Sequence, residues 1–145
     1  MDQFDFSKLE VTQQTIWVEL PEVCPKARVC VRPATEANSP YFNAMMKRSG
    51  MRARRMVRTD RISIEDAQQN RSEDRELFPR YVLTNWDGIT DKAGKPVPFA
   101  EDAVREFCAK LPDWLFDRVR NAAATPERFL PEGEDVLDAG KIAGN

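Results

Sequence analysis

The stretch YVLTNWDGITDKAGKPVPF, residues Tyr81–Phe99, decides how the rest of this chain is arranged. Its first half continues an apolar helical pattern, because Phe78, Val82 and Trp86 recur every four residues. We therefore expect a helix that ends on the indole of Trp86 and buries it as an anchor of the core.

The second half of the stretch cannot continue that helix. Glycines supply positive φ for tight turns, and prolines fix φ while removing a backbone donor. Pro96 and Pro98 favour an extended segment that leads Phe99 into the next helix. Asp87 is interpreted as stabilising the helix end or the turn, because Asp87 and Asp91 lack the alternating oxygens and distal Glu of a calcium loop. The predicted structural joint comprises Trp86, Asp87, Gly88, Gly94, Pro96, Pro98 and Phe99.

Length and composition favour one non-catalytic domain. The chain has 145 residues, of which 41% are hydrophobic and 32% charged, typical of a small core with long solvated helices. It contains no His, the most frequent general base and commonest metal ligand. Its three cysteines fit reduced thiols, with a Cys24–Cys30 bridge as the lesser alternative. Residues 1–10 are acidic and no apolar run approaches the roughly 20 residues of a membrane span. We expect no enzyme activity, cofactor, metal site or membrane association.

Two segments near the start show strand patterns. Ile16–Leu20 and Ala27–Arg32 are rich in β-branched residues, and the prolines between them suit a hairpin loop. Two strands alone are marginally stable, so this hairpin must lie on helices or pair with the edge of another chain.

Capping signals and periodicity predict about five helices after the hairpin. Asn38 caps a helix with Pro40 in its first turn, which Gly50 stops or loosens. A polar helix follows the capping-box-like Ser63–Asp66, and Pro79 should kink or break it. Further helical patterns cover Phe99–Leu111, Pro112–Ala122 and Thr125–Leu130.

These patterns predict an α+β fold, mostly α-helical, with an N-terminal β-hairpin packed on about five helices. Trp17, Trp86 and Trp114 are all assigned to the core. The predicted organisation is a flexible arm over 1–12, a single globular domain over 13–130 with the hairpin at 16–32 and helices over 39–123, and an acidic flexible tail over 131–145.

Charge is unevenly distributed, although the formal net charge is only −2. From Lys47 to Arg61 seven basic residues face one acid, and from Thr125 to Asn145 five acids face two bases. No aromatic residue accompanies the basic cluster, which favours a solvated face or a docking strip for an acidic protein segment over a nucleic-acid site. The methionines are either ordinary core or an adaptable binding surface. The predicted partner-binding residues are Met45, Met46, Arg52, Arg54, Arg55 and Arg58.

The order of these signals resembles the tail assembly chaperones of long, flexible-tailed (siphovirus) bacteriophages. The similarity lies in a hairpin with a Trp, the helix start NSPYF at residues 38–42, and NWDGITDKAGKPVPF at residues 85–99. It continues through LPDWLFDRV at residues 111–119 to ERFL at residues 127–130. The basic stretch Lys47–Arg61 departs from the family's pattern, and the resemblance implies no role for it.

The resemblance implies a small protein of the host cytoplasm that is absent from the mature virion. Such proteins bind the tape-measure protein, keep it soluble and recruit tail-tube subunits, and they have no catalytic residues. Coating a long rod requires self-association, so we also expect a homo-oligomer formed through the hairpin edge or the opposed charges. Many members are also made in a longer, frameshifted form, for which Gly140-Lys141 is the candidate slippery site.

Two other classes of protein fit the same features. A structural virion protein of the head–tail connector or tail-terminator type would also be small and oligomeric, but would persist in purified particles. A nucleic-acid-binding regulator would use the basic cluster, and its affinity for DNA would fall steeply with salt.

Overall fold

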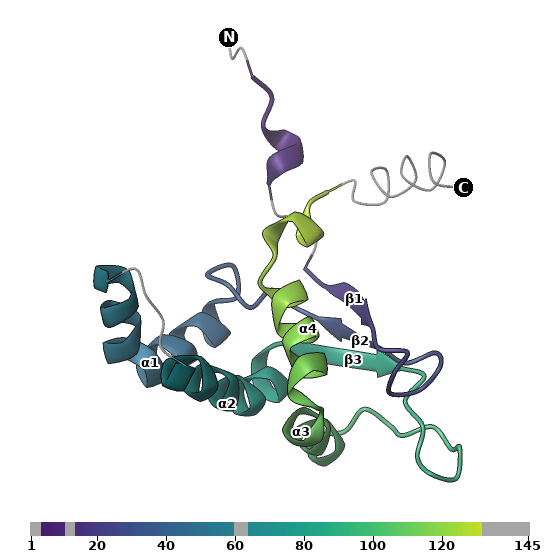
Figure 1. The fold of residues 1–145 in the computed structure, drawn as a ribbon. Coiled ribbons are helices and arrows are strands. Elements are labelled where there is room, and N and C mark those ends of the chain that lie inside the picture. The colour runs from purple at the N-terminus through teal and green to yellow at the C-terminus, as the bar shows by residue number, and fades with distance from the viewer. Residues whose placement is uncertain (1–3, 11–13, 60–63, 132–145) are drawn as a thin grey trace.

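Four α-helices and one three-stranded antiparallel sheet make up the part of the chain that the computed structural model describes, residues 4–10, 14–59 and 64–131 (Figure 1). The elements follow the order β1 (Ile16–Glu19), β2 (Arg28–Val31), α1 (Ser39–Thr59), α2 (Ile64–Tyr81), β3 (Leu83–Asp87), α3 (Glu101–Lys110) and α4 (Asp113–Ala123). Two short 3-10 helices, η1 (Ser7–Leu9) and η2 (Pro126–Phe129), flank them. The predicted α+β class is confirmed. The prediction of about five helices packed on a two-stranded hairpin is right only in part.

The prediction that a helix ends on Trp86 is wrong, because Trp86 lies in strand β3. Helix α2 ends at Tyr81, and the chain passes into β3, where Trp86 is paired with Val29 of β2. Val82 and Trp86 are four residues apart, a spacing that shares one face of a strand as well as one face of a helix. Pro79 does not break α2 but lies in its last turn, so only a short piece of helix follows the N–H hydrogen bond that the proline removes.

Helix α1 begins where the sequence predicts and ends later. The side-chain oxygen of Asn38 accepts a hydrogen bond from the N–H of Tyr41 at 3.3 Å, as an N-cap does. The helix passes through Gly50, which costs only about 1 kcal/mol in a helix interior, and runs to Thr59. The basic sequence up to Thr59 therefore lies on a helix. The predicted capping residue Ser63 and the tail beyond Pro131 lie outside the described residues.

The sheet has the order β1-β2-β3, so the hairpin pairs within its own chain. The outer edge of β1 faces arginines that follow it in the chain. Arg128 donates to the carbonyl of Trp17 at 3.3 Å, and Arg118 donates to the carbonyl of Glu19 at 3.4 Å. Two acceptors on this edge are therefore already occupied, which reduces its capacity to add a strand from another molecule.

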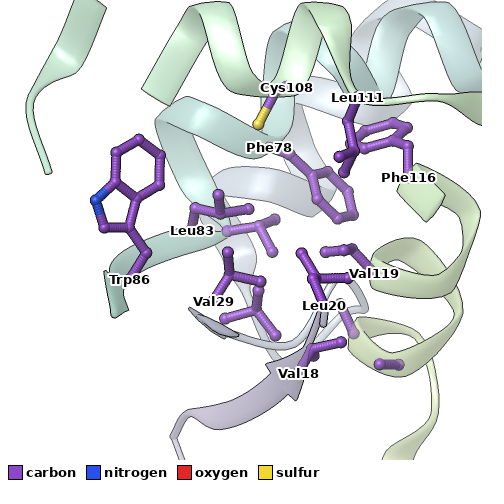
Figure 2. Close-up of a cluster of buried hydrophobic side chains, with 14 of the residues drawn as sticks. Val18, Leu20, Val29, Phe78, Leu83, Trp86, Cys108, Leu111, Phe116 and Val119 are labelled. Carbon is purple, nitrogen blue, oxygen red and sulfur yellow. The ribbon is translucent and has the colours of Figure 1, made fainter. Parts of the chain in front are cut away.

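The core lies between the sheet and the helices that cross it (Figure 2). Val18 and Val29 face Phe78 from α2 and Phe116 from α4, and each of these four side chains is at most 2% exposed. The rings of Phe78 and Phe116 meet edge to face with centroids 5.4 Å apart, a favourable aromatic geometry. The core therefore joins strands from the first third of the chain to helices from its middle and last thirds.

Candidate functional site

The buried side chain of Trp86 holds the predicted structural joint against the core. Its side chain is 8% exposed, and its indole N–H donates to the carbonyl of Val97 at 2.8 Å. Phe99 meets the indole edge to face at 5.2 Å, and Phe107 of α3 lies 5.3 Å from it. The indole therefore ties β3 to the loop and to α3, so its role as a core anchor agrees with the structure although its place on a helix does not.

Two glycines allow the loop after β3 to turn. Gly88 and Gly94 have φ values of +72° and +82°, in the left-handed region that favours glycine. At Gly88 an added Cβ would also lie 2.2 Å from the carbonyl oxygen of Lys26. Asp91 stabilises the second turn, because its carboxylate accepts hydrogen bonds from the N–H groups of Ala93 and Lys95 at 2.8 and 3.0 Å.

Asp87, which was expected to stabilise the helix end or the turn, lies instead at the end of β3. It faces Arg28 across the sheet in an exposed ion pair of 3.4 Å. The sequence argues against a calcium loop at Asp87 and Asp91, and the carboxylate of Asp91 binds backbone N–H groups of its own turn. Within the described residues, no three potential metal ligands gather at one place.

The joint forms one wall of an apolar cleft of about 440 Å³. Trp86 and Val97 contribute that wall, and Ala103 and Phe107 of α3 face it. The β1–β2 turn and the start of α4 also contribute lining residues. The lining residues are Glu22, Val23, Trp86, Ile89, Val97, Ala103, Glu106, Phe107, Lys110, Leu111, Pro112 and Leu115.

An exposed tryptophan stands beside this cleft. Trp114 was predicted to be core, but it is 59% exposed, because Leu115 and Phe116 form the buried face of α4. The guanidinium of Arg118 lies 5.7 Å from the centroid of its ring. Trp114 is not part of the cleft lining, but the Arg118 guanidinium near its ring also binds Glu22, which is a lining residue, so the exposed ring lies near the rim. Trp17 is likewise only half-buried, with Arg28 stacked 4.1 Å above its ring.

The charges at the rim of the cleft neutralise one another. Arg118 donates two hydrogen bonds of 2.8 Å to the carboxylate of Glu22, and these bonds lower the pKa of that carboxyl. Lys110 donates to Glu106 at 2.9 Å on the opposite side. The cleft is therefore lined by apolar groups and bordered by ion pairs rather than by a net charge.

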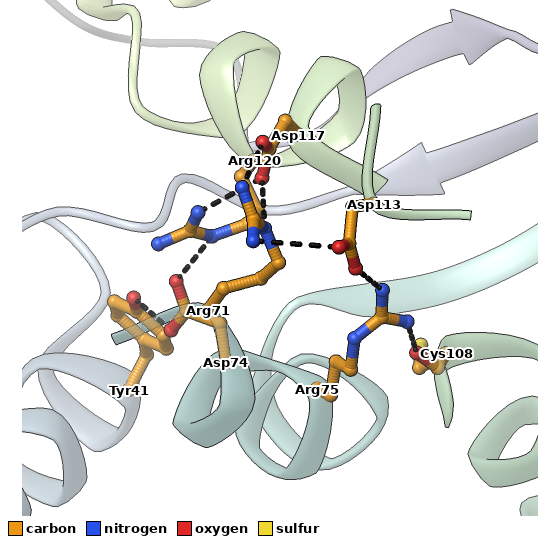
Figure 3. A network of polar contacts seen from close by, with 8 residues as sticks. All are labelled: Tyr41, Arg71, Asp74, Arg75, Cys108, Asp113, Asp117 and Arg120. Atoms are coloured by element: carbon orange, nitrogen blue, oxygen red, sulfur yellow. Dashed lines mark hydrogen bonds and ion pairs between the residues drawn. The ribbon is translucent and has the colours of Figure 1, made fainter. Parts of the chain in front are cut away.

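A polar network on the other side of α4 holds α1, α2 and α4 together (Figure 3). The phenol of Tyr41 donates to Asp74 at 2.7 Å, and Arg120 donates to the other oxygen of Asp74 at 2.8 Å. Burial raises the pKa of Asp74 despite these two bonds. Burial, followed by the nearby Asp74 carboxylate, also raises the pKa of the Tyr41 phenol. These groups are held by mutual contacts and serve to fix helix positions.

The network continues along the α2–α4 interface. Arg71 binds Asp117 with two bonds of 3.0 and 2.8 Å, and these bonds lower the pKa of Asp117. Arg75 bridges Asp113 of α4 and the carbonyl of Cys108 of α3, at 2.5 and 2.8 Å. Such bidentate and charge-assisted bonds are among the stronger side-chain contacts. This network was not predicted, although the alternating charges of α2 and α4 are a visible signal of it in the sequence.

The three cysteines differ in exposure: Cys24 is half-buried, and Cys30 and Cys108 are buried. All three are free thiols, so the Cys24–Cys30 bridge does not form. Burial raises the pKa of the Cys108 thiol to about 12, which keeps it protonated and poorly nucleophilic.

The predicted partner-binding residues all lie on α1, away from the cleft lining. Met46 is 39% exposed, whereas Met45 packs partly against the core. Arg52, Arg54, Arg55 and Arg58 belong to the second half of α1, and their side chains are outside the description. Their role in binding stays a prediction.

The molecule is thus a small α+β domain with an apolar, charge-bordered cleft. A family model described as YdaY prophage protein matches residues 37–140, so the chain belongs to that family and is a phage-derived protein. No curated protein and no solved structure matches the chain. None of the helices that the structure describes is long and apolar enough to cross a membrane. The match begins just before α1 and leaves the β1–β2 hairpin outside it.

Proposed function

We propose that this chain is a phage tail assembly chaperone. In this role it binds the tape-measure protein, keeps it soluble and recruits tail-tube subunits, without catalysing a reaction. The phage origin given by the family match supports the proposal, as does the resemblance carried by residues 85–99. The protein would act in the host cytoplasm and leave before the virion is complete.

The observation that carries the proposal is the apolar cleft with Trp114 beside it. A tape-measure protein is a long helical rod that exposes apolar stripes before the tail tube surrounds it. An amphipathic helix binds a partner by placing its apolar face in a hydrophobic groove. Trp is enriched among the residues that dominate binding energy at such surfaces. The walls around Phe107 and the adjoining Trp114 provide a surface of this kind.

The paired rim charges suit a partner with a repetitive surface. Because Glu22 and Glu106 are each neutralised by a basic neighbour, the rim imposes little charge preference on the helix. Recognition then depends mainly on apolar contact, which many positions along one rod can supply. A cleft of about 440 Å³ gives weak individual contacts, and many copies along the rod give a strong total.

Coexpression with the tape-measure protein of the same prophage tests this role. Ala103→Glu places a charge in the wall of the cleft, and Trp114→Ala removes the exposed ring. Each change should reduce the soluble tape-measure protein and its copurification with the chain by at least about tenfold. Ile64→Ala is the matched control, because Ile64 is an apolar residue that is 78% exposed and is not part of the cleft.

The circular dichroism melting curves of the variants must match that of the wild type before the result is interpreted. Unchanged solubility and copurification with both folded cleft variants would show that the cleft does not bind the tape-measure protein. An insoluble tape-measure protein in the presence of the wild-type chain would count against the chaperone role itself.

A further inference from the structure

A second surface, separate from the apolar cleft, carries a concentration of basic residues. Two hollows of about 570 and 510 Å³ flank Arg48 and Arg80, one between α1 and α2 and one between α2 and α3. We call the two hollows together the basic groove. Its charged lining residues are Lys47, Arg48, Arg75, Arg80 and Arg105, with Glu76 as the acid.

Three of these five basic side chains already have acidic partners. Arg48 binds Glu76 at 2.8 Å, Arg75 binds Asp113 and Arg105 binds Asp102. Lys47 and Arg80 are exposed and form no ion pair with any residue that the structure describes. Arg80 lies only against the ring of Tyr81, 5.2 Å from its centroid. The groove therefore retains two positive charges that an anionic partner can neutralise.

The hollow between α1 and α2 also has an apolar floor. Pro40, Ala44, Leu77 and Tyr81 line it beneath the basic rim. A ligand that fits it combines carboxylates with apolar side chains. That composition fits an acidic peptide with a short hydrophobic centre better than a nucleic acid. Among the described residues that line the groove, Tyr81 is the single aromatic side chain that could stack on a base.

A segment of that composition is present in the same chain. Residues 132–138 read EGEDVLD, with four carboxylates around Val136 and Leu137 and no basic residue before Lys141. The described chain reaches this segment from η2, which lies beside β1 and donates to it through Arg128. The basic groove belongs to α1, α2 and α3, and in Figure 1 α1 and α2 lie away from η2, toward the left of the view.

We infer that the basic groove of one molecule binds the acidic segment 132–138 of a second copy. The contact joins two different surfaces, so each bound molecule still offers one free groove and one free segment. Head-to-tail contacts of this kind build closed rings where the rotation between copies closes, and open chains where it does not. The assembly should weaken as salt rises, since exposed charges are screened beyond about 8 Å at physiological ionic strength. The inference is independent of what the apolar cleft binds.

Two neutralised variants of the full-length chain separate the two halves of the contact. The groove variant carries Lys47→Gln and Arg80→Gln. The segment variant carries Glu132→Gln, Glu134→Gln, Asp135→Asn and Asp138→Asn. The matched control carries Lys92→Gln and Lys95→Gln, which removes two positive charges from the exposed loop outside the groove.

Sedimentation velocity at low salt should show concentration-dependent oligomers for the wild type and the control. Each neutralised variant alone should associate at least about tenfold more weakly. A mixture of the two variants should form one-to-one dimers that grow no further, because the mixture retains one intact groove and one intact segment per pair.

Three results would overturn the inference. A wild type that stays monomeric at every concentration would show that the groove does not join copies. Variants that associate as strongly as the wild type would assign association to another surface. The third result combines two observations: the wild type binds duplex DNA and the groove variant does not, and the mixture forms no dimer. This result would assign the groove to nucleic acid. Melting curves matching that of the wild type establish that the variants are folded.

Discussion

Replacing Trp86 with Ala should remove much of the stability of this domain. The side chain is 8% exposed, packs against Phe99 and Phe107, and donates a hydrogen bond to Val97. Truncation of a buried aromatic side chain costs about 3–5 kcal/mol, and the carbonyl of Val97, which loses its hydrogen bond, adds roughly 1 kcal/mol. The free energy of unfolding of a natural domain is only about 5–15 kcal/mol, so the variant should be marginally folded.

Denaturant unfolding followed by circular dichroism measures this loss directly. At roughly 2–4 °C per kcal/mol, the total loss of about 4–6 kcal/mol should lower the thermal midpoint by about 8–24 °C. Trp86→Phe keeps most of the packing and loses the indole bond, so its loss should be nearer 1–2 kcal/mol. Trp114→Ala removes the same side chain from a site that is 59% exposed and should cost less than about 1 kcal/mol. A loss below about 1 kcal/mol for Trp86→Ala would refute the role of the indole as a core anchor.

Three further predictions follow from the loop, the polar network and the gene. Gly88→Ala should lower the free energy of unfolding by about 1–3 kcal/mol, because an added Cβ meets the backbone of Lys26. Gly94→Ala should cost less, because nothing lies within 4 Å of an added Cβ at that position. Equal losses for the two variants in urea unfolding would contradict this prediction. Because Arg71 lowers the pKa of Asp117, ionised Asp117 stabilises the fold above its unfolded pKa near 3.8, and that contribution is lost as pH falls through the lower folded pKa. Asp117→Asn should therefore make stability depend less on pH below about pH 5, and an unchanged pH profile would argue against the Arg71 contact. Gly140-Lys141, outside the described residues, should be encoded by a slippery heptamer with an open −1 frame; an immediate −1 stop codon and no longer product on an immunoblot would end that idea.

The parts of the fold that depend on local signals could be predicted from the sequence. Asn38 marks the start of α1, and the glycines of the loop mark its turns, because capping and positive φ are properties of a few adjacent residues. Strand β3 could not be recognised in this way. The spacing of Val82 and Trp86 fits a helix and a strand equally, and pairing with Val29, distant in sequence, decides between them.

The candidate site was harder to predict, because four separate segments form it. Trp114 and Leu115 are adjacent and both large and apolar, and only the packing of α4 shows which of them is exposed. The sequence shows the charges of Arg71 and Arg75, but it does not show which acids they pair with, for a similar reason. Charged residues on a polar helix are usually solvated, and their partners lie on another helix.

Quantitative mass spectrometry of purified phage particles, compared with lysate of the induced cells, tests the chaperone role most directly. The chain should be abundant in the lysate together with the tape-measure protein and absent from particles that contain tape-measure and tail-tube proteins. A fixed number of copies in each purified particle would contradict the account and assign the chain to the structural proteins of the virion.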